Sequence, residues 1–104
     1  MALQTIEFEL NSTGTPRRVA APVHHGVVGS GDLEVLVSPI GKSGKLQVRI
    51  VTPVKGFEDL WRRVLTHFAN ETGLTDALVE INDNNASPAV VALRLRQALA
   101  EASA

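Results

Sequence analysis

The sequence predicts an α+β domain, in which a mostly antiparallel sheet of about four strands carries two helices packed on one face. Alternating apolar and polar residues mark strands at residues 3–10, 32–37, 45–51 and 76–81. Apolar residues at spacings of three and four mark two helices, which begin near residues 57 and 88. No repeat or composition shift divides the chain, so we expect a single domain over residues 1–104.

Each predicted strand gathers its apolar side chains on one face. The residues expected on that face are Ile6, Phe8, Leu10, Leu33, Val35, Val37, Leu46, Val48, Ile50, Ala77, Val79 and Ile81. The runs at 32–37 and 45–51 follow one another across the loop "SPIGKSG", so we expect them to pair as an antiparallel hairpin. Residues 17–28 are ambiguous, because their valines favour extended structure while Pro22 restricts any strand there to an edge or a break.

The two helices have clear apolar stripes and boundaries. The first stripe consists of Phe57, Leu60, Trp61, Val64, Leu65 and Phe68, which places Trp61 in the core and leaves His67 on the flank. Gly73 is a suitable C-terminal stop. Ser87 and Pro88 form a cap and first turn for the second helix, which we expect to run to about residue 101. Val90 and Leu93 lie off its stripe, either as ordinary exposed residues or as a patch that faces a partner.

Composition excludes several classes of function. Ten basic and eleven acidic residues give a net charge of −1, which argues against binding to nucleic acid or to an anionic membrane. The absence of cysteine excludes disulfides, thiolate metal sites and a cysteine nucleophile. No apolar run approaches the roughly 18 residues of a membrane span, and the N-terminus lacks the pattern of a signal peptide. We therefore expect a cytoplasmic protein.

Catalytic and metal-binding patterns are weak, so we expect neither catalytic residues nor metal ligands. His24 and His25 are adjacent, and neighbouring side chains of an extended segment point in opposite directions. A serine hydrolase set could combine Ser30, a histidine and Asp32, but the G-x-S-x-G elbow is missing and Asp32 is too close in sequence. The string "GVVGSG" does not match the dinucleotide fingerprint, and "NDNNAS" lacks the spacing of a calcium loop.

One serine is nevertheless unusual, because Ser30 lies between Gly29 and Gly31 in "GVVGSGDLEVLV". Either the chain makes a tight turn there, or the glycines leave room for something large to reach the hydroxyl. A serine without a neighbouring base is a weak nucleophile, which suits a residue that another enzyme modifies. Asp32 and Glu34 either help a partner to recognise this segment or are ordinary solvated charges. Lys42 and Lys45 could contact a phosphate only if the fold brings them near Ser30.

The same string closely resembles the signature of the acyl carrier (delta) subunits of bacterial malonate decarboxylases. The likeness continues in "VRIVTPVKGFEDLWRRVLTHF", which resembles the family's segment entering the first helix. It continues again in "VEINDNNASPAVVALRLRQALAE", which is similar to its C-terminal strand, Asn-rich loop and helix. The resemblance covers most of residues 26–101, and the first 25 residues match more loosely.

The resemblance implies that Ser30 carries 2'-(5''-phosphoribosyl)-3'-dephospho-coenzyme A through a phosphodiester, with Gly29, Gly31 and Asp32 around the attachment point. Its thiol would hold acetyl, which is exchanged for malonyl that then loses carbon dioxide. The implied partners are the acyl transferase and decarboxylase subunits, a malonyl transferase and a transferase that attaches the cofactor. A chain without cysteine needs such an external thiol, and a bound cofactor supplies one. The alternatives are a carrier of a related, citrate lyase-like complex, or a small assembly module in which Gly-Ser-Gly is only a turn.

Overall fold

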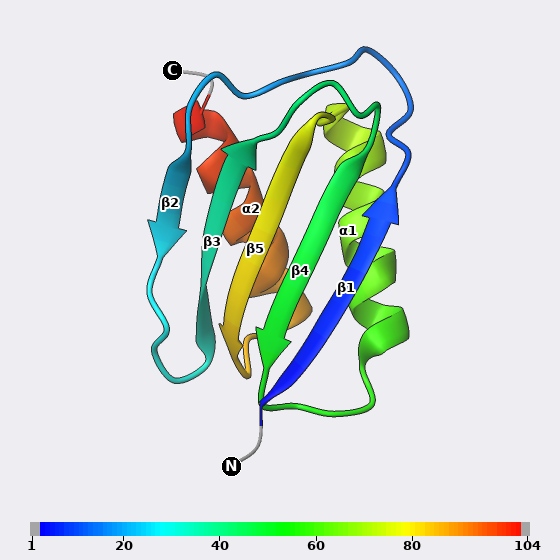
Figure 1. Cartoon of the computed structure of the whole chain (residues 1–104). Coiled ribbons are helices and arrows are strands. Elements are labelled where there is room, and N and C mark those ends of the chain that lie inside the picture. The colour runs from blue at the N-terminus through cyan, green and yellow to red at the C-terminus, as the bar shows by residue number, and fades with distance from the viewer. Residues whose placement is uncertain (1–2, 103–104) are drawn as a thin grey trace.

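A computed structural model describes residues 3–102, and the outermost two residues at each end of the predicted domain 1–104 lie outside it. The element order is β1 (Gln4–Leu10), β2 (Val23–Gly26), β3 (Asp32–Pro39), β4 (Leu46–Thr52), α1 (Glu58–Thr72), β5 (Ala77–Asn84) and α2 (Pro88–Ala102). Both helices cover the same face of one sheet (Figure 1). The predicted α+β fold, with a mostly antiparallel sheet and two helices on one face, is confirmed.

The sheet has five strands in the order β1-β4-β5-β3-β2, one more than the four or so predicted. The additional strand is β2, which comes from the ambiguous segment and pairs antiparallel with β3 at the edge of the sheet. Pro22 lies immediately before β2, where its missing N–H removes no bond of the sheet. Only β4 and β5 are parallel to each other, and the other neighbouring pairs are antiparallel.

The predicted hairpin between residues 32–37 and 45–51 is wrong, because β5 lies between β3 and β4. In β5, Ile81 is opposite Val35 of β3 on one side and Ile50 of β4 on the other. The loop from Ile40 to Lys45 passes over the start of β5 and is fixed there by Asp76. The backbone of Asp76 bonds Ile40 and Lys45, at 3.0 and 2.9 Å. Its carboxylate also accepts backbone N–H groups of that loop.

The core lies between the sheet and the helices, and the predicted alternation holds along β1, β3, β4 and β5. The side chains of Leu33, Val35 and Val37 on β3 are fully buried, and Leu65 and Leu95 meet the sheet from the two helices. Trp61 is 7% exposed, as the helical stripe predicts. Both predicted helix boundaries are confirmed. Gly73 takes the left-handed conformation after α1, and the Ser87 hydroxyl accepts the N–H of Val90 at the start of α2.

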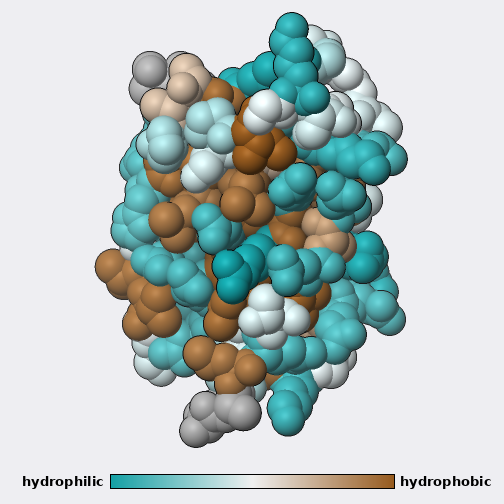
Figure 2. Space-filling model, in the orientation of Figure 1, coloured by the Kyte–Doolittle hydropathy of each residue, from teal (hydrophilic) through white to brown (hydrophobic). Residues whose placement is uncertain are grey.

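The other face of the sheet carries no helix and turns toward the viewer in Figure 1. Its side chains are exposed or half-buried, which is usual for antiparallel sheets covered on one side. Figure 2 shows hydrophilic side chains over most of this face, with apolar atoms between them. Within residues 3–102, neither helix is long and apolar enough to cross a membrane.

Strand directions bring one set of loops to the same end of the sheet. Because β3 is antiparallel to β5, the start of β3 lies beside the end of β5, and Asp32 is opposite Asn84. Since β4 runs parallel to β5, it ends there too, and α1 and α2 begin there (the lower end in Figure 1). We call this the Ser30 end of the molecule, because the β2–β3 connection containing Ser30 is also found there.

Candidate functional site: the Ser30 turn

Ser30 lies at the tip of a tight turn between β2 and β3, and its side chain is exposed. The N–H of Asp32 donates to the carbonyl of Gly29 at 3.0 Å, which closes a four-residue turn with Ser30 in the second position. Gly31, in the third position, has φ +73°, whereas Ser30 does not adopt a positive φ. These signs define a type II turn, in which the third residue is normally glycine. Among the residues described, none bonds the Ser30 hydroxyl, so it is open to reaction.

The turn is fixed on both sides of Ser30, although the serine itself is not held. The N–H of Gly31 donates to the carbonyl of Asn84 at the end of β5, at 2.9 Å. The carboxylate of Asp32 accepts two bonds from Arg94 of α2, Nε to Oδ1 at 3.0 Å and Nη2 to Oδ2 at 2.8 Å. It also accepts the N–H of Leu33 at 2.7 Å. Sheet and helix thus hold the backbone that presents the hydroxyl.

The contact between Asp32 and Arg94 is also an ion pair. The hydrogen bonds from the Arg94 guanidinium, with the backbone N–H of Leu33, lower the pKa of the Asp32 carboxyl. The same contact raises the pKa of Arg94. A planar guanidinium matches a carboxylate with two parallel bonds, so the pair fixes orientation as well as distance. Asp32 therefore positions the turn, and its expected role toward a cofactor or partner stays a prediction.

The glycines around Ser30 differ in what the fold demands of them. Gly26 has φ +88°, and a Cβ there would lie 2.4 Å from the carbonyl oxygen of Leu33, so only glycine fits. Gly31 has open space around it, but its φ favours glycine. Gly29 has neither constraint, since a Cβ would meet only a methyl group of Val27 at 3.9 Å. No contact or left-handed backbone angle requires the glycine at position 29, and its expected role in leaving access to Ser30 stays a prediction.

Two exposed valines precede the turn. Val27 is 64% exposed and Val28 is 51% exposed, so two apolar side chains project into solvent beside Ser30. In the sequence these valines indicate only an extended segment, and they are not predicted as part of the site. Arg94 and Asn84, which hold the turn, are not predicted either. Two successive valines next to Gly-Ser-Gly were a usable signal, whereas nothing in the sequence shows which element supplies an anchor for Asp32.

The histidines of β2 point to opposite faces of the sheet, as predicted. His24 Nε2 lies 2.8 Å from Glu34 Oε2, and His25 Nδ1 lies 2.8 Å from Glu101 of α2. The bond from His24, together with one from Asn82, lowers the pKa of Glu34. Both histidines are therefore paired with carboxylates and neither activates Ser30. In the described part of the chain no three His, Asp or Glu side chains gather as a metal site would require.

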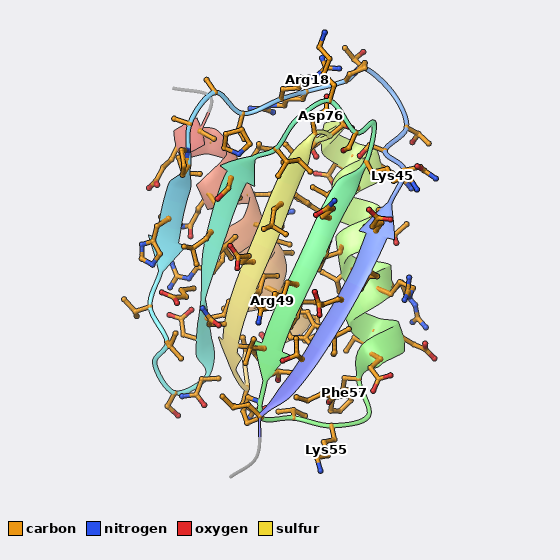
Figure 3. The ribbon with its side chains drawn as sticks, viewed as in Figure 1. Arg18, Lys45, Arg49, Lys55, Phe57 and Asp76 are labelled. Atoms are coloured by element: carbon orange, nitrogen blue, oxygen red, sulfur yellow. The ribbon has the colours of Figure 1, made fainter. Side chains whose placement is uncertain are left out.

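The remaining candidates lie apart from Ser30. Lys42 and Lys45 belong to the loop at the opposite end of the sheet, where Figure 3 shows Lys45 near Asp76 and Arg18. The fold therefore does not bring either lysine near Ser30. Val90 packs against the core, whereas Leu93 is 45% exposed, so the two do not form one surface patch. His67 is on the surface beside Glu71.

Comparison with known proteins identifies the family. The profile of the malonate decarboxylase delta subunit (MdcD) matches residues 20–102. The malonate decarboxylase acyl carrier protein of Malonomonas rubra is 48% identical over 101 residues, covering 96% of this chain and 89% of that protein. The protein of the same name from Stutzerimonas stutzeri is 43% identical over 99 residues, covering 95% and 96%.

A solved structure agrees. One chain of a Pseudomonas malonate decarboxylase hetero-tetramer, crystallised with malonate, superposes with a TM-score of 0.81 at 36% identity. The match covers 94% of this chain and 97% of the other. The chain belongs to the malonate decarboxylase delta subunit family.

Proposed function

We propose that this chain is the acyl carrier subunit of a malonate decarboxylase, and that Ser30 is the residue to which its prosthetic group is attached. The observation that carries the proposal is the contrast within the turn. Its backbone is fixed by Asn84 and Arg94, while the hydroxyl between them is exposed and unbonded within the described chain. A fixed turn with an accessible hydroxyl suits a residue that other proteins must find and modify.

The attached group would be the phosphoribosyl-dephospho-coenzyme A named above. In its attachment, Ser30 Oγ forms a bond to phosphorus and loses its proton, while a leaving group departs from an activated precursor. Ser30 has no base beside it, so the transferase that attaches the group must supply one. When bound, the group supplies the thiol that holds the acyl unit as a thioester. Gly29 and Gly31 leave the phosphate and its ribose free of side-chain crowding.

The residues of this chain present the attached acyl group to the other subunits and do not themselves break bonds in it. The other subunits, which we take to be acyl transferase and decarboxylase subunits, would carry out malonyl exchange and decarboxylation. A malonyl transferase would supply the acyl unit. Val27 and Val28 offer apolar contact beside the attachment point. Because each is already partly covered, burying the rest in an interface contributes about half of the roughly 1.5–3 kcal/mol of a fully exposed side chain. The proposal places the complex in the cytoplasm, where a coenzyme A derivative is available.

The test is to follow the acyl group. The complex purified from its native host is incubated with labelled malonate, and its subunits are separated under denaturing conditions. We expect label on this chain that hydroxylamine releases, as it releases thioesters. We expect none in Ser30→Ala, and wild-type labelling in Ser38→Ala, which changes the serine at the other end of β3. Labelling of the Ser30→Ala chain would contradict the proposal.

A further inference from the structure

An apolar pocket of about 330 Å³ opens at the Ser30 end of the molecule, between the starts of the two helices. The linker into α1 contributes Val54 and Phe57, and α1 itself contributes Trp61. The other wall is formed by the β5–α2 loop and by Pro88 and Val91. Figure 3 shows Phe57 at this end of the fold, where the linker enters α1. The presentation of Ser30 by its turn does not involve this pocket.

The pocket is joined to the Ser30 turn through one residue. Asn84, whose carbonyl accepts the N–H of Gly31, stands between Asp83 and Asn85, and both of these line the pocket. The turn that presents Ser30 and the pocket wall are therefore both built on the end of β5 and the residue that follows it.

The lining is mostly apolar and includes two aromatic side chains, so it suits a neutral occupant that can stack on them. Phe57 is 50% exposed although it is large and apolar, and Trp61 lies deeper in the same wall. The one carboxylate in the lining, Asp83, is already engaged. It accepts the hydroxyl of Thr52 at 2.8 Å and the N–H groups of Asn85 and Ala86. Glu58 and Asp59 in the first turn of α1 add negative charge next to Phe57, which offsets the attraction of the helix N-terminus for a phosphate.

Resting on the carrier function proposed above, we propose that this pocket holds the adenine ring of the prosthetic group attached to Ser30. Of the parts of that group, only adenine is aromatic and uncharged at neutral pH. Only the phosphate and two ribose rings separate it from the serine oxygen. Bases stack on aromatic side chains without needing specific hydrogen bonds. Docking the adenine fixes the root of the arm and leaves the diphosphate and the thiol-bearing end in solvent, free to reach the partner subunits.

The affinity required is small, because the ring is tethered. A short flexible tether gives an effective concentration in the mM range. A dissociation constant of about 1 mM for the free ligand is then enough to fill the pocket much of the time in the modified protein. Such weak binding of free adenylates is measurable, because Trp61 is the only tryptophan and the chain has no tyrosine. Its fluorescence therefore reports directly on the pocket.

The first test uses the unmodified chain, made in a host that lacks the attaching transferase. It is titrated with 3'-dephospho-coenzyme A, with AMP and with pantetheine, while Trp61 emission is recorded and corrected for absorption by the ligand. We expect saturable quenching by the first two, with midpoints in the mM range, and none by pantetheine. Phe57→Ala should raise the midpoint at least several-fold, whereas Leu93→Ala, which removes an equally exposed apolar side chain elsewhere, should leave it unchanged.

The second test compares the modified and unmodified chains from the native host. Mass spectrometry first establishes that the adduct is on Ser30, so a failure of the proposed function shows itself separately as a missing adduct. With the adduct present, we expect Trp61 to be less accessible to acrylamide than in the unmodified chain. Equal accessibility in the two forms, a linear response to AMP, or a response to pantetheine alone would overturn the placement of the adenine.

Discussion

Replacing Gly29 by alanine separates access to Ser30 from the stability of the fold. The backbone at Gly29 lies outside the left-handed range, and the new Cβ would have only Val27 Cγ2 near it, at 3.9 Å. Replacing glycine by alanine at a compatible position stabilises a protein by about 0.4–1 kcal/mol, through the lower entropy of the unfolded chain. For a domain of this size the melting temperature should rise by a few degrees, since 1 kcal/mol corresponds to about 4–8 °C.

The same substitution at the two neighbouring glycines should have the opposite effect on stability. Gly31 would meet no atom but must keep φ +73°, so Gly31→Ala should cost about 1–2 kcal/mol. Gly26 combines φ +88° with a contact of 2.4 Å to the Leu33 carbonyl. Adding about 1–3 kcal/mol for overpacking to the same backbone strain gives a cost on the order of 2–5 kcal/mol. The three variants should therefore rank in that order in urea unfolding.

Modification is the second measurement on this series. Gly29→Ala should fold at least as well as the wild type, yet receive the prosthetic group more slowly, because the methyl group lies beside the attacking hydroxyl. The rate is followed by the mass of the intact chain, incubated with the attaching transferase and its activated precursor. A Gly29→Ala chain that is destabilised by more than 1 kcal/mol, or that is modified at the wild-type rate, would contradict the role given to Gly29 in this turn.

Other substitutions test the anchors and the core. Arg94→Leu should loosen the Ser30 turn without unfolding the protein, which faster amide hydrogen exchange in the turn would show. Arg94→Lys should show the same faster exchange, because a lysine cannot make both bonds to Asp32. Leu65→Ala should cost about 2–5 kcal/mol in urea unfolding, because the side chain is fully buried, and a cost below 1 kcal/mol would contradict its place in the core. The bond from Arg18 and the N–H groups of the 40–45 loop lower the pKa of Asp76 to about 2. A lowered pKa stabilises the fold above the unfolded value of about 4, and this stabilisation is lost as the pH falls toward 2. Asp76→Asn should therefore flatten the decline of stability between these pH values, and an unchanged slope would count against the contact.

The elements of this fold are predictable from local pattern, whereas the order of the strands is not. The alternation along β3 and β4 shows which face of each is buried, and the structure confirms it residue by residue. Alternation says nothing about which strand is the neighbour, because backbone hydrogen bonds are the same for every partner. The 40–45 loop is long enough to cross one intervening strand, since sheet strands are about 5 Å apart. The α1 crossover then lets β5 enter the gap parallel to β4.

The candidate site also has a part that the sequence predicts and a part that it does not. Ser30 and its glycines are visible in the sequence, because a serine between two glycines before a strand is a local signal. The groups that hold the turn come from β5 and α2, more than fifty residues away, so no local pattern shows them. The pocket beside the turn is hidden for a related reason. Its wall residues read as ordinary core positions, and only the three-dimensional arrangement shows that Phe57 is left half exposed.

The proposed function requires that the arm be anchored on the Ser30 hydroxyl, and intact-protein mass spectrometry detects that attachment itself. The chain is isolated from its native host as wild type and as Ser30→Ala, and its mass is compared with that of the bare polypeptide. We predict a phosphoribosyl-dephospho-coenzyme A adduct on the wild-type chain, mapped by peptide fragmentation to Ser30 and missing from the variant. A bare wild-type chain within a working complex, or an adduct on another residue, would contradict it.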